Sequence, residues 1–142
     1  MRDAPGHPIN ARLLITDGAG RWLVCRHRSD VWLPPGGSVE DESPQEAAER
    51  EVWEEMRLRV WVGHLLFAAW IPPRRDGRRS RLTLMFRATR LDDRDEPQPD
   101  GREVQECRWL DPGEARRMVH PLMYRLMEKA LTTGPFYEEV AE

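Results

Sequence analysis

Residues 36–58 read GGSVEDESPQEAAEREVWEEMRL, a Gly-rich, acidic stretch that runs into a helix-forming segment. Ser43 is a suitable N-cap, Pro44 suits the first helical position, and Glu46 completes a Ser-x-x-Glu capping box. Residues after Pro44 favour helix as far as Met56. The stretch therefore predicts a helix that begins after Ser43.

Two faces of this helix differ in character. Ala48, Val52 and Met56 recur every four residues, so they should form the stripe that packs on the core. Glu51 and Glu55 flank the stripe and should lie at the border between core and solvent. A carboxylate at such a border is costly without a counter-charge.

Three acids, Glu51, Glu54 and Glu55, are spaced so that they converge on one side of the helix. A solvated helix face without a metal is one interpretation, but a merely solubilising face would interleave these acids with lysines. A hard cation is the other, because Mg²⁺ takes oxygen ligands and works through carboxylates together with substrate phosphates. We therefore predict a site for one to three Mg²⁺ ions, with Mn²⁺ as a substitute.

The composition is that of one globular domain of 142 residues. The net charge of −3 predicts no bulk attraction to nucleic acid or to an anionic membrane. The longest apolar-rich run, residues 58–71, is interrupted by charged residues and glycine, and residues 1–10 lack a signal-peptide core. We expect a cytoplasmic protein in which Cys25 and Cys107 are reduced thiols.

Before the helix, residues 9–17 have strand character, and residues 21–27 alternate like the second arm of a hairpin. Residues 31–42 are rich in Pro and Gly and predict a shaped loop.

After the helix, residues 58–71 predict a long strand with a bulge near Gly63, paired as a hairpin with residues 80–90. Residues 103–111 are expected to form the last strand, followed by two short helices and a loose tail after Thr133. This order predicts an α+β fold, a mixed sheet with helices on its faces.

At this point the sequence resembles a known family. Residues 36–58 are similar to the Nudix box, and the capping box falls where the helix of that family begins. The positions that satisfy the pattern, in order, are Gly36, Glu42, Arg50, Glu51, Val52, Glu54, Glu55 and Leu58. The flanking strands and the length also fit a single domain of that family over residues 1–142, with an α/β/α sandwich.

Two positions depart from the pattern. Arg57 stands where the box has a glycine, so we expect the helix to end in another way, with strain or a shifted terminus. The loop is one residue shorter than usual, because only Asp41 separates Glu40 from Glu42. Counting gives Gly36 as the first glycine of the box, whereas the shape of the loop favours Gly37.

The resemblance implies Mg²⁺-dependent hydrolysis of a diphosphate linkage in a nucleoside diphosphate derivative. It implies that Glu51, Glu54 and Glu55 hold the metal with a backbone carbonyl near Gly36 or Gly37. It also implies that Arg50 orients Glu51 or Glu42, while Glu42 and Ser43 support the box. The location of the general base varies in the family, and the candidates here are Glu51 and an acid near the last strand, where we favour Glu103 over Glu106.

Five arginines crowd the turn between the two hairpin strands, at positions 74, 75, 78, 79 and 81. Guanidinium groups bind phosphate in a bidentate manner, so Arg74, Arg75, Arg78, Arg79 and Arg81 are candidate substrate ligands, and a solvated turn is the alternative. Trp32, Trp61 and Trp70 are candidates for stacking on a base, although most of the tryptophans should be core residues.

Three rival functions remain from the sequence. One is a catalytically silent domain of the same fold that binds or senses nucleotides, but such domains tend to lose box glutamates. Another is isopentenyl diphosphate isomerase, whose reactive cysteine and metal-binding histidines have no counterpart here. The third is an acidic structural helix. The expected partner is a small-molecule nucleotide, without membrane or specific nucleic-acid binding, and family analogy suggests a homodimer.

Overall fold

The structure is a computed structural model that describes residues 6–142; the first five residues of the predicted domain lie outside it. The elements along the chain are β1 (Ile9–Ile15), β2 (Trp22–His27), β3 (Trp32–Leu33), β4 (Gly36–Ser38), α1 (Pro44–Met56), β5 (Val60–Ile71), β6 (Arg81–Arg90), β7 (Val104–Leu110), α2 (Pro112–Met118), α3 (Pro121–Thr133) and β8 (Phe136–Glu139).

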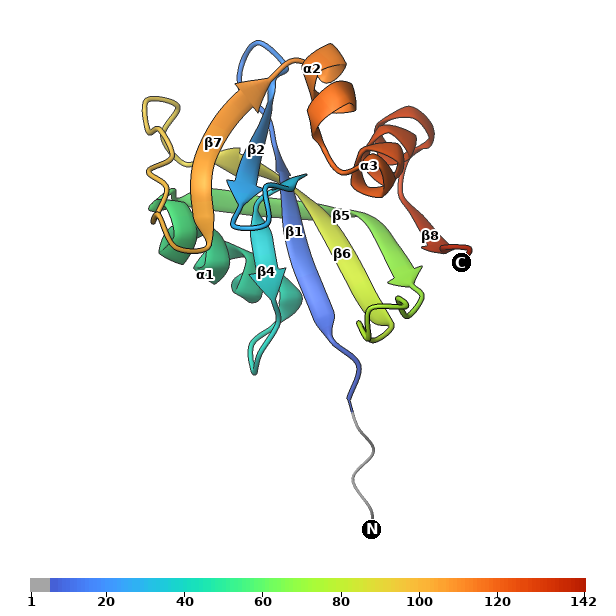
Figure 1. The fold of residues 1–142 in the computed structure, drawn as a ribbon. Coiled ribbons are helices and arrows are strands. Elements are labelled where there is room, and N and C mark those ends of the chain that lie inside the picture. Colours follow the sequence, from blue (N-terminus) through green and yellow to red (C-terminus); the bar gives the residue numbers. More distant parts are fainter. Residues whose placement is uncertain (1–5) are drawn as a thin grey trace.

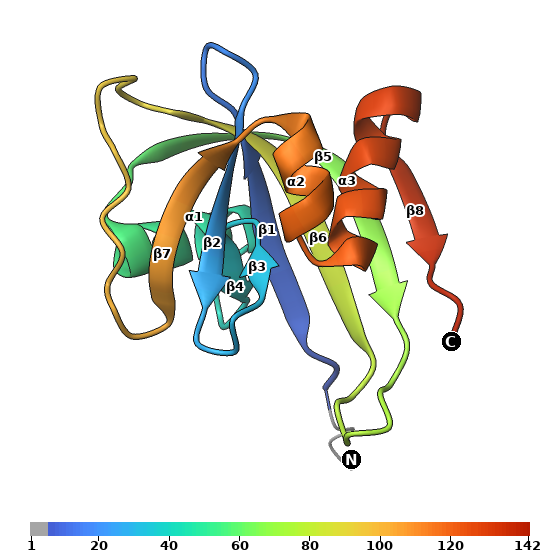
Figure 2. The same cartoon turned by 45° about the horizontal axis from the view of Figure 1, so that its top comes forward.

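The strands form two sheets with helices on either side (Figure 1). The larger sheet has the order β4-β1-β6-β5-β8, and the smaller has the order β3-β2-β7. Helix α1 packs on one face of the larger sheet, while α2 and α3 cover the other (Figure 2). The larger sheet is mixed, since β1 runs parallel to β6 and antiparallel to β4. The predicted α+β architecture is confirmed.

Strand β1 supplies both faces of the larger sheet, because successive side chains of a strand point in opposite directions. Leu13 and Ile15 belong to the apolar cluster that includes α1 residues, whereas Leu14 belongs to the cluster under α2 and α3. Arg12 alternates with these residues and therefore shares the Leu14 face. A charged side chain is thus placed on the side of the sheet that α3 covers.

Helix α1 begins as predicted. The Ser43 hydroxyl accepts a hydrogen bond from the Glu46 amide at 3.2 Å, and the Glu46 carboxylate accepts one from the Ser43 amide at 3.3 Å. At the other end the expected strain at Arg57 is present, but the expectation that the helix would end in another way was wrong. Arg57 itself adopts the left-handed conformation, with φ 52° and ψ 36°, and its amide donates to the Trp53 carbonyl. The helix therefore ends as it would at a glycine, and the strain lies on Arg57.

The predicted hairpin of residues 9–17 and 21–27 is not formed. Strands β1 and β2 lie in different sheets and are joined by an isolated bridge between Thr16 and Trp22. Both edges of β1 are already occupied, by β6 and β4, so β2 pairs instead with β7 and β3. The Pro- and Gly-rich stretch, expected to be all loop, contains β3 and β4.

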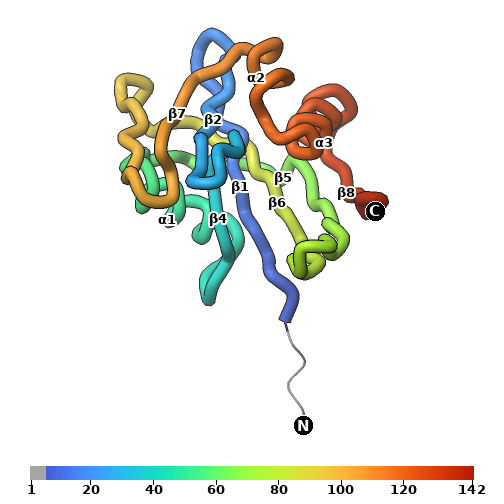
Figure 3. The backbone as a smooth tube through the Cα atoms, viewed as in Figure 1, coloured from blue at the N-terminus to red at the C-terminus, as the bar shows by residue number. Residues whose placement is uncertain are grey.

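The expectation of a loose tail was also wrong. Residues 136–139 form β8, which pairs in parallel with β5, so β7 is not the last strand. The Phe136 ring stacks on Phe67 with centroids 5.4 Å apart, and Arg125 and Lys129 hold Glu138. These contacts hold β8 beside the larger sheet. The backbone tube in Figure 3 shows the course of this last segment.

The predicted pairing of residues 58–71 with residues 80–90 is confirmed. Strands β5 and β6 form the predicted hairpin, and the register shifts on either side of Leu65, close to Gly63. Cys25 and Cys107 are free thiols on neighbouring strands, with sulfur atoms 3.4 Å apart. Among residues 6–142, no helix is long and apolar enough to cross a membrane.

Candidate active site

Arg50 is the centre of a hydrogen-bonded network on α1, which we call the Arg50 network. Its Nε donates to Glu42 Oε2 at 2.8 Å, and its Nη1 donates to Glu51 Oε1 at 3.0 Å and to Glu54 Oε2 at 3.2 Å. Its Nη2 donates to the Ser38 carbonyl at 3.2 Å. The hydrogen bond from Arg50 lowers the pKa of Glu42 and keeps that carboxylate charged. The predicted pairing of Arg50 with Glu51 and Glu42 is therefore present in the structure.

Glu55 is the most buried acid of the cluster, with 7% of its surface exposed. Its Oε2 atom is buried and has no hydrogen-bond partner among the described residues. Burial, followed by the negative charge of Glu51 beside it, raises the pKa of Glu55 to about 8. A helix that only needed solubility has no reason to bury a carboxyl group against another, since the desolvation is costly.

The two glycines before α1 have different neighbours. A Cβ atom on Gly36 would lie 2.2 Å from the Ala11 carbonyl oxygen, so Gly36 is required for close approach to β1. A Cβ atom on Gly37 would lie 2.6 Å from the carboxyl carbon of Glu51. Gly37 is therefore the glycine that faces the acidic cluster, and the metal-binding carbonyl expected at Gly36 or Gly37 stays a prediction.

The acids fit a divalent cation in their chemistry. The buried Glu55 oxygen lacks a partner and lies next to Glu51, a combination that a positive charge would stabilise. In the part of the chain that the structure describes, no group of three or more His, Cys, Asp or Glu residues is arranged to hold a metal ion. Glu51 and Glu54 are instead paired with Arg50. Binding of an ion by all three glutamates thus requires side chains of the Arg50 network to rotate.

The candidate bases near β7 differ in their surroundings. Glu106 forms ion pairs with Arg108 and Arg26, and the hydrogen bond from Arg108 lowers its pKa. Glu103 is exposed at the end of the loop that precedes β7. Hydrogen bonds tie this loop to the end of α1, because Gln98 and Asp100 donate to the carbonyls of Met56 and Glu55. The loop lies near the acids, while the role of Glu103 stays a prediction.

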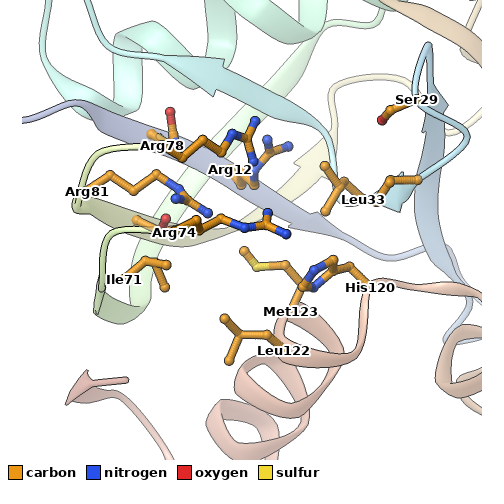
Figure 4. Close-up of a pocket in the computed structure, with 13 residues that line it drawn as sticks. Arg12, Ser29, Leu33, Ile71, Arg74, Arg78, Arg81, His120, Leu122 and Met123 are labelled. Atoms are coloured by element: carbon orange, nitrogen blue, oxygen red, sulfur yellow. The ribbon is translucent and has the colours of Figure 1, made fainter. Parts of the chain in front are cut away.

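Four arginines line a cavity on the face of β1 that α3 covers, opposite the face on which α1 packs (Figure 4). They are Arg12 from β1, Arg74 and Arg78 from the turn after β5, and Arg81 from β6, and we call this space the arginine cavity. Its volume is about 160 Å³. The far wall includes His120, Leu122 and Met123, at and after the start of α3.

The predicted substrate ligands lie in different places, and only some of them line the arginine cavity. Arg74, Arg78 and Arg81 line the arginine cavity. Arg75 lines an adjoining, more open hollow of about 630 Å³ together with Arg74 and Arg81, and Arg79 lines neither. Trp32 does not line the cavity, and its ring instead lies under the Arg108 guanidinium, 5.3 Å from the Cζ atom. Trp61 is exposed and Trp70 is half-buried in β5.

Sequence reasoning missed Arg12 and His120. Arg12 donates to the Pro34 carbonyl at 2.8 Å, and its charge acts on Glu55 and Glu51. The signal for Arg12 was a lone charge within the apolar strand ARLLI. His120 carries no comparable signal, because its place in the cavity depends on the packing of α3.

Comparison with known proteins identifies the family. The family model described as NUDIX domain matches residues 6–130. The chain belongs to the NUDIX family. The resemblance inferred from residues 36–58 is confirmed, and the match covers nearly all of the described chain.

Relatives of this NUDIX chain include a MutT-like protein of Streptomyces ambofaciens, 29% identical over 134 residues, which are 92% of this chain and 82% of that protein. A second is an RNA pyrophosphohydrolase of Saccharophagus degradans, 41% identical over 61 residues, which are 41% of this chain and 36% of that protein. A solved NUDIX hydrolase from Nitrosomonas europaea has a TM-score of 0.75 at 19% identity and covers 99% of this chain and 82% of its own.

These relationships make the NUDIX chain an enzyme of the pyrophosphohydrolase type. NUDIX hydrolases generally use divalent metals, in agreement with the donor chemistry of the glutamates on α1. An acidic helix with only a structural role stays the alternative to the predicted metal site.

Proposed function

We propose that the chain hydrolyses a diphosphate linkage in a nucleoside diphosphate derivative, with Mg²⁺ as the metal and Mn²⁺ as a substitute. The observation that carries this proposal is the buried Glu55 carboxyl group, which has an unpartnered oxygen beside Glu51 on the helix of the NUDIX box. Glu51, Glu54 and Glu55 would hold the ion, which lowers the pKa of a bound water and neutralises phosphate oxygens.

Neighbouring residues hold the acids in place in the metal-free protein. Arg50 donates to Glu51 and Glu54 on one side of α1, and its Nε atom donates to Glu42. Gly37 leaves room for the Glu51 carboxyl group. These hydrogen bonds restrict Glu51 and Glu54, and some of them must break when the ion binds.

A base must accept the proton of the attacking water, and the candidates are Glu51 and Glu103. Glu106 is the weaker choice, because its ion pairs with Arg108 and Arg26 lower its pKa and occupy its oxygens. Glu103 lies in a loop that is tied to the end of α1 through Asp100, so it can approach the acids without disrupting β7.

A silent nucleotide-binding domain is the second candidate. The complete set of glutamates at 51, 54 and 55 argues against it, since a domain that only binds has no need to bury Glu55. A homodimer and a cytoplasmic location remain predictions made from the sequence.

The test is hydrolysis of a panel that contains ADP-ribose, dinucleoside polyphosphates, nucleotide sugars and nucleoside triphosphates, each with and without Mg²⁺. We expect Mg²⁺-dependent cleavage of at least one compound and its loss in a variant that combines Glu54→Gln with Glu55→Gln. Glu49→Gln is the matched control, because Glu49 is an exposed acid of α1 outside the Arg50 network.

A second readout separates metal binding from activity. Mg²⁺ should raise the unfolding temperature of the unmodified protein but not that of the double variant. Activity that survives in the double variant would overturn the metal assignment, and no cleavage of any compound would favour the silent domain.

A further inference from the structure

The arginine cavity is small, with a volume of about 160 Å³, which is below the ~300 Å³ at which pockets for drug-sized ligands begin. It shares Arg74, Arg81 and His120 with an adjoining, more open hollow of about 630 Å³, where the rest of a larger ligand can lie. Four of the eight polar side chains that line it are cations, those of Arg12, Arg74, Arg78 and Arg81. Of the thirteen residues that line it in the described chain, none is acidic. The size and the charge together suit a small anion.

The cations of the cavity are incompletely neutralised. Arg74 has Asp76 at 4.0 Å, outside the cavity, and Arg12 donates to the Pro34 carbonyl, which carries no net charge. Arg81 Nη1 and His120 Nδ1 are buried without a hydrogen-bond partner among residues 6–142. Like charges and unpaired polar atoms in a partly buried space are destabilising until an anion binds.

The pKa shifts of Arg81 and His120 agree with a cavity that lacks negative charge. Burial lowers the pKa of Arg81, and the nearby charges of Arg78 and Arg74 lower it further. Burial also lowers the pKa of His120, again followed by the charge of Arg74, so His120 is neutral at pH 7. A neutral imidazole has one nitrogen that donates, and it can bind an anion without adding to the repulsion.

The cavity and the acids of α1 lie on opposite faces of β1, and Arg12 links them through its charge. Arg12 is the register partner of Gly36 across β1 and β4, and the next residue, Gly37, faces Glu51. The charge of Arg12 acts on both Glu55 and Glu51. For a substrate whose diphosphate lies at these acids to use the arginine cavity, its neighbouring groups must extend past β4, the edge strand of the larger sheet.

We propose that the arginine cavity binds a phosphoryl group of the substrate that is not part of the bond being cleaved. This inference rests on the proposed function and narrows the substrate to a class: nucleotides with a further phosphate beyond the scissile diphosphate, in a longer polyphosphate chain or on a sugar. Guanidinium groups recognise the oxygens of such a group in a bidentate manner. Free orthophosphate has the same chemistry, so the experiment must separate the two sources.

The experiment compares paired substrates in the full-length chain with Mg²⁺. The pairs are ADP-ribose with its 2′-phosphorylated form, and nucleoside diphosphates with triphosphates. In Arg81→Gln we expect the KM of the phosphorylated member to rise about tenfold or more, because a charge-assisted hydrogen bond contributes ~1.5–3 kcal/mol. The KM of the unphosphorylated member should change less than about twofold. Arg78→Gln provides a second variant if Arg81→Gln fails to fold.

The matched control is Arg94→Gln, which removes the same charge from an exposed arginine that pairs with Asp92 in the loop after β6. This variant should leave the KM of both substrates of each pair unchanged. The inference would be overturned if Arg81→Gln and Arg78→Gln changed the KM of both substrates of a pair equally, or changed neither KM. The proposed function would still stand.

Binding without metal provides the independent readout. Tripolyphosphate and orthophosphate are titrated calorimetrically into the metal-free protein and into Arg81→Gln. We expect tripolyphosphate to bind and to lose affinity in the variant. If this holds although no compound of the panel is cleaved, the proposed function fails and the anion site stands. If orthophosphate binds but an extra phosphate on the substrate gives no advantage in KM, the substrate assignment is wrong.

Discussion

Gly37 and Glu51 lie so close together that no side chain fits between them. A Cβ atom at position 37 would be 2.6 Å from the Glu51 carboxyl carbon and 2.7 Å from its Oε2 atom. Glu51 in turn accepts a hydrogen bond from Arg50, so its carboxyl group cannot withdraw without breaking that contact. The glycine is thus part of how the acid is positioned.

Gly37→Ala should therefore displace Glu51 from Arg50. We expect about a tenfold or greater loss of hydrolysis and a fall of less than ~1 kcal/mol in the free energy of unfolding, because the atoms in the way belong to the end of the Glu51 side chain, which can move. Kinetics on a cleaved compound and urea denaturation measure the two effects. Gly18→Ala is the control, because a Cβ atom there meets nothing within 4 Å. Equal behaviour of the two variants would contradict the role of Gly37.

Arg57 carries backbone strain at the end of α1, and Arg57→Gly should relieve it. The left-handed conformation costs a residue with a Cβ atom ~1–2 kcal/mol, partly offset by the greater entropy of an unfolded glycine. We expect the free energy of unfolding to rise by ~0.5–1 kcal/mol. Arg57→Ala loses the same contact with Trp53 but keeps the strain, so it should not stabilise the protein. Stabilisation by alanine as well would show that the side chain, not the backbone, is the cause.

Arg50→Lys should weaken the Arg50 network, because one ammonium group cannot reach Glu42, Glu51 and Glu54 together as the guanidinium does. We expect a fall of about tenfold or more in kcat with a properly folded protein. Arg94→Lys, in a local pair with Asp92, is the matched control. An unchanged kcat in Arg50→Lys would mean that catalysis does not need a guanidinium group that donates to all three carboxylates.

Glu138 should make stability depend on acid pH. Hydrogen bonds from Arg125 and then Lys129 lower its pKa from the ordinary 4.5 to about 2. Because the folded-state pKa is the lower one, the stabilisation is present above pH 4.5 and is lost as the pH falls toward 2.

Glu138→Gln should accordingly lower the free energy of unfolding at pH 7 by up to ~1 kcal/mol, the range for partly exposed ion pairs. The difference from the unmodified protein should vanish near pH 2, as followed by urea denaturation across pH. Glu139→Gln alters the exposed neighbour and should have no such pH dependence. A constant difference at all pH values would refute the ion-pair explanation.

Local features of the sequence were sufficient to predict where α1 begins and which of its faces packs on the core. The capping box at Ser43 and the apolar stripe depend on residues three or four positions apart, and both are present as expected. The β5–β6 hairpin was predictable for the same reason, because its two strands are joined by a short turn. The family also followed from the sequence, since the box lies within one loop and one helix.

The partners of β1, the strand at the end of the chain and the arginine cavity needed the tertiary structure. Residue patterns show that a strand has a buried face, but not which edge another strand will occupy, so β2 and β8 were misjudged. The sequence by itself determined a helix whose acids are suited to a metal. Only the fold decided that Arg12 and Arg81 line one cavity, because that depends on pairing between strands far apart in the chain.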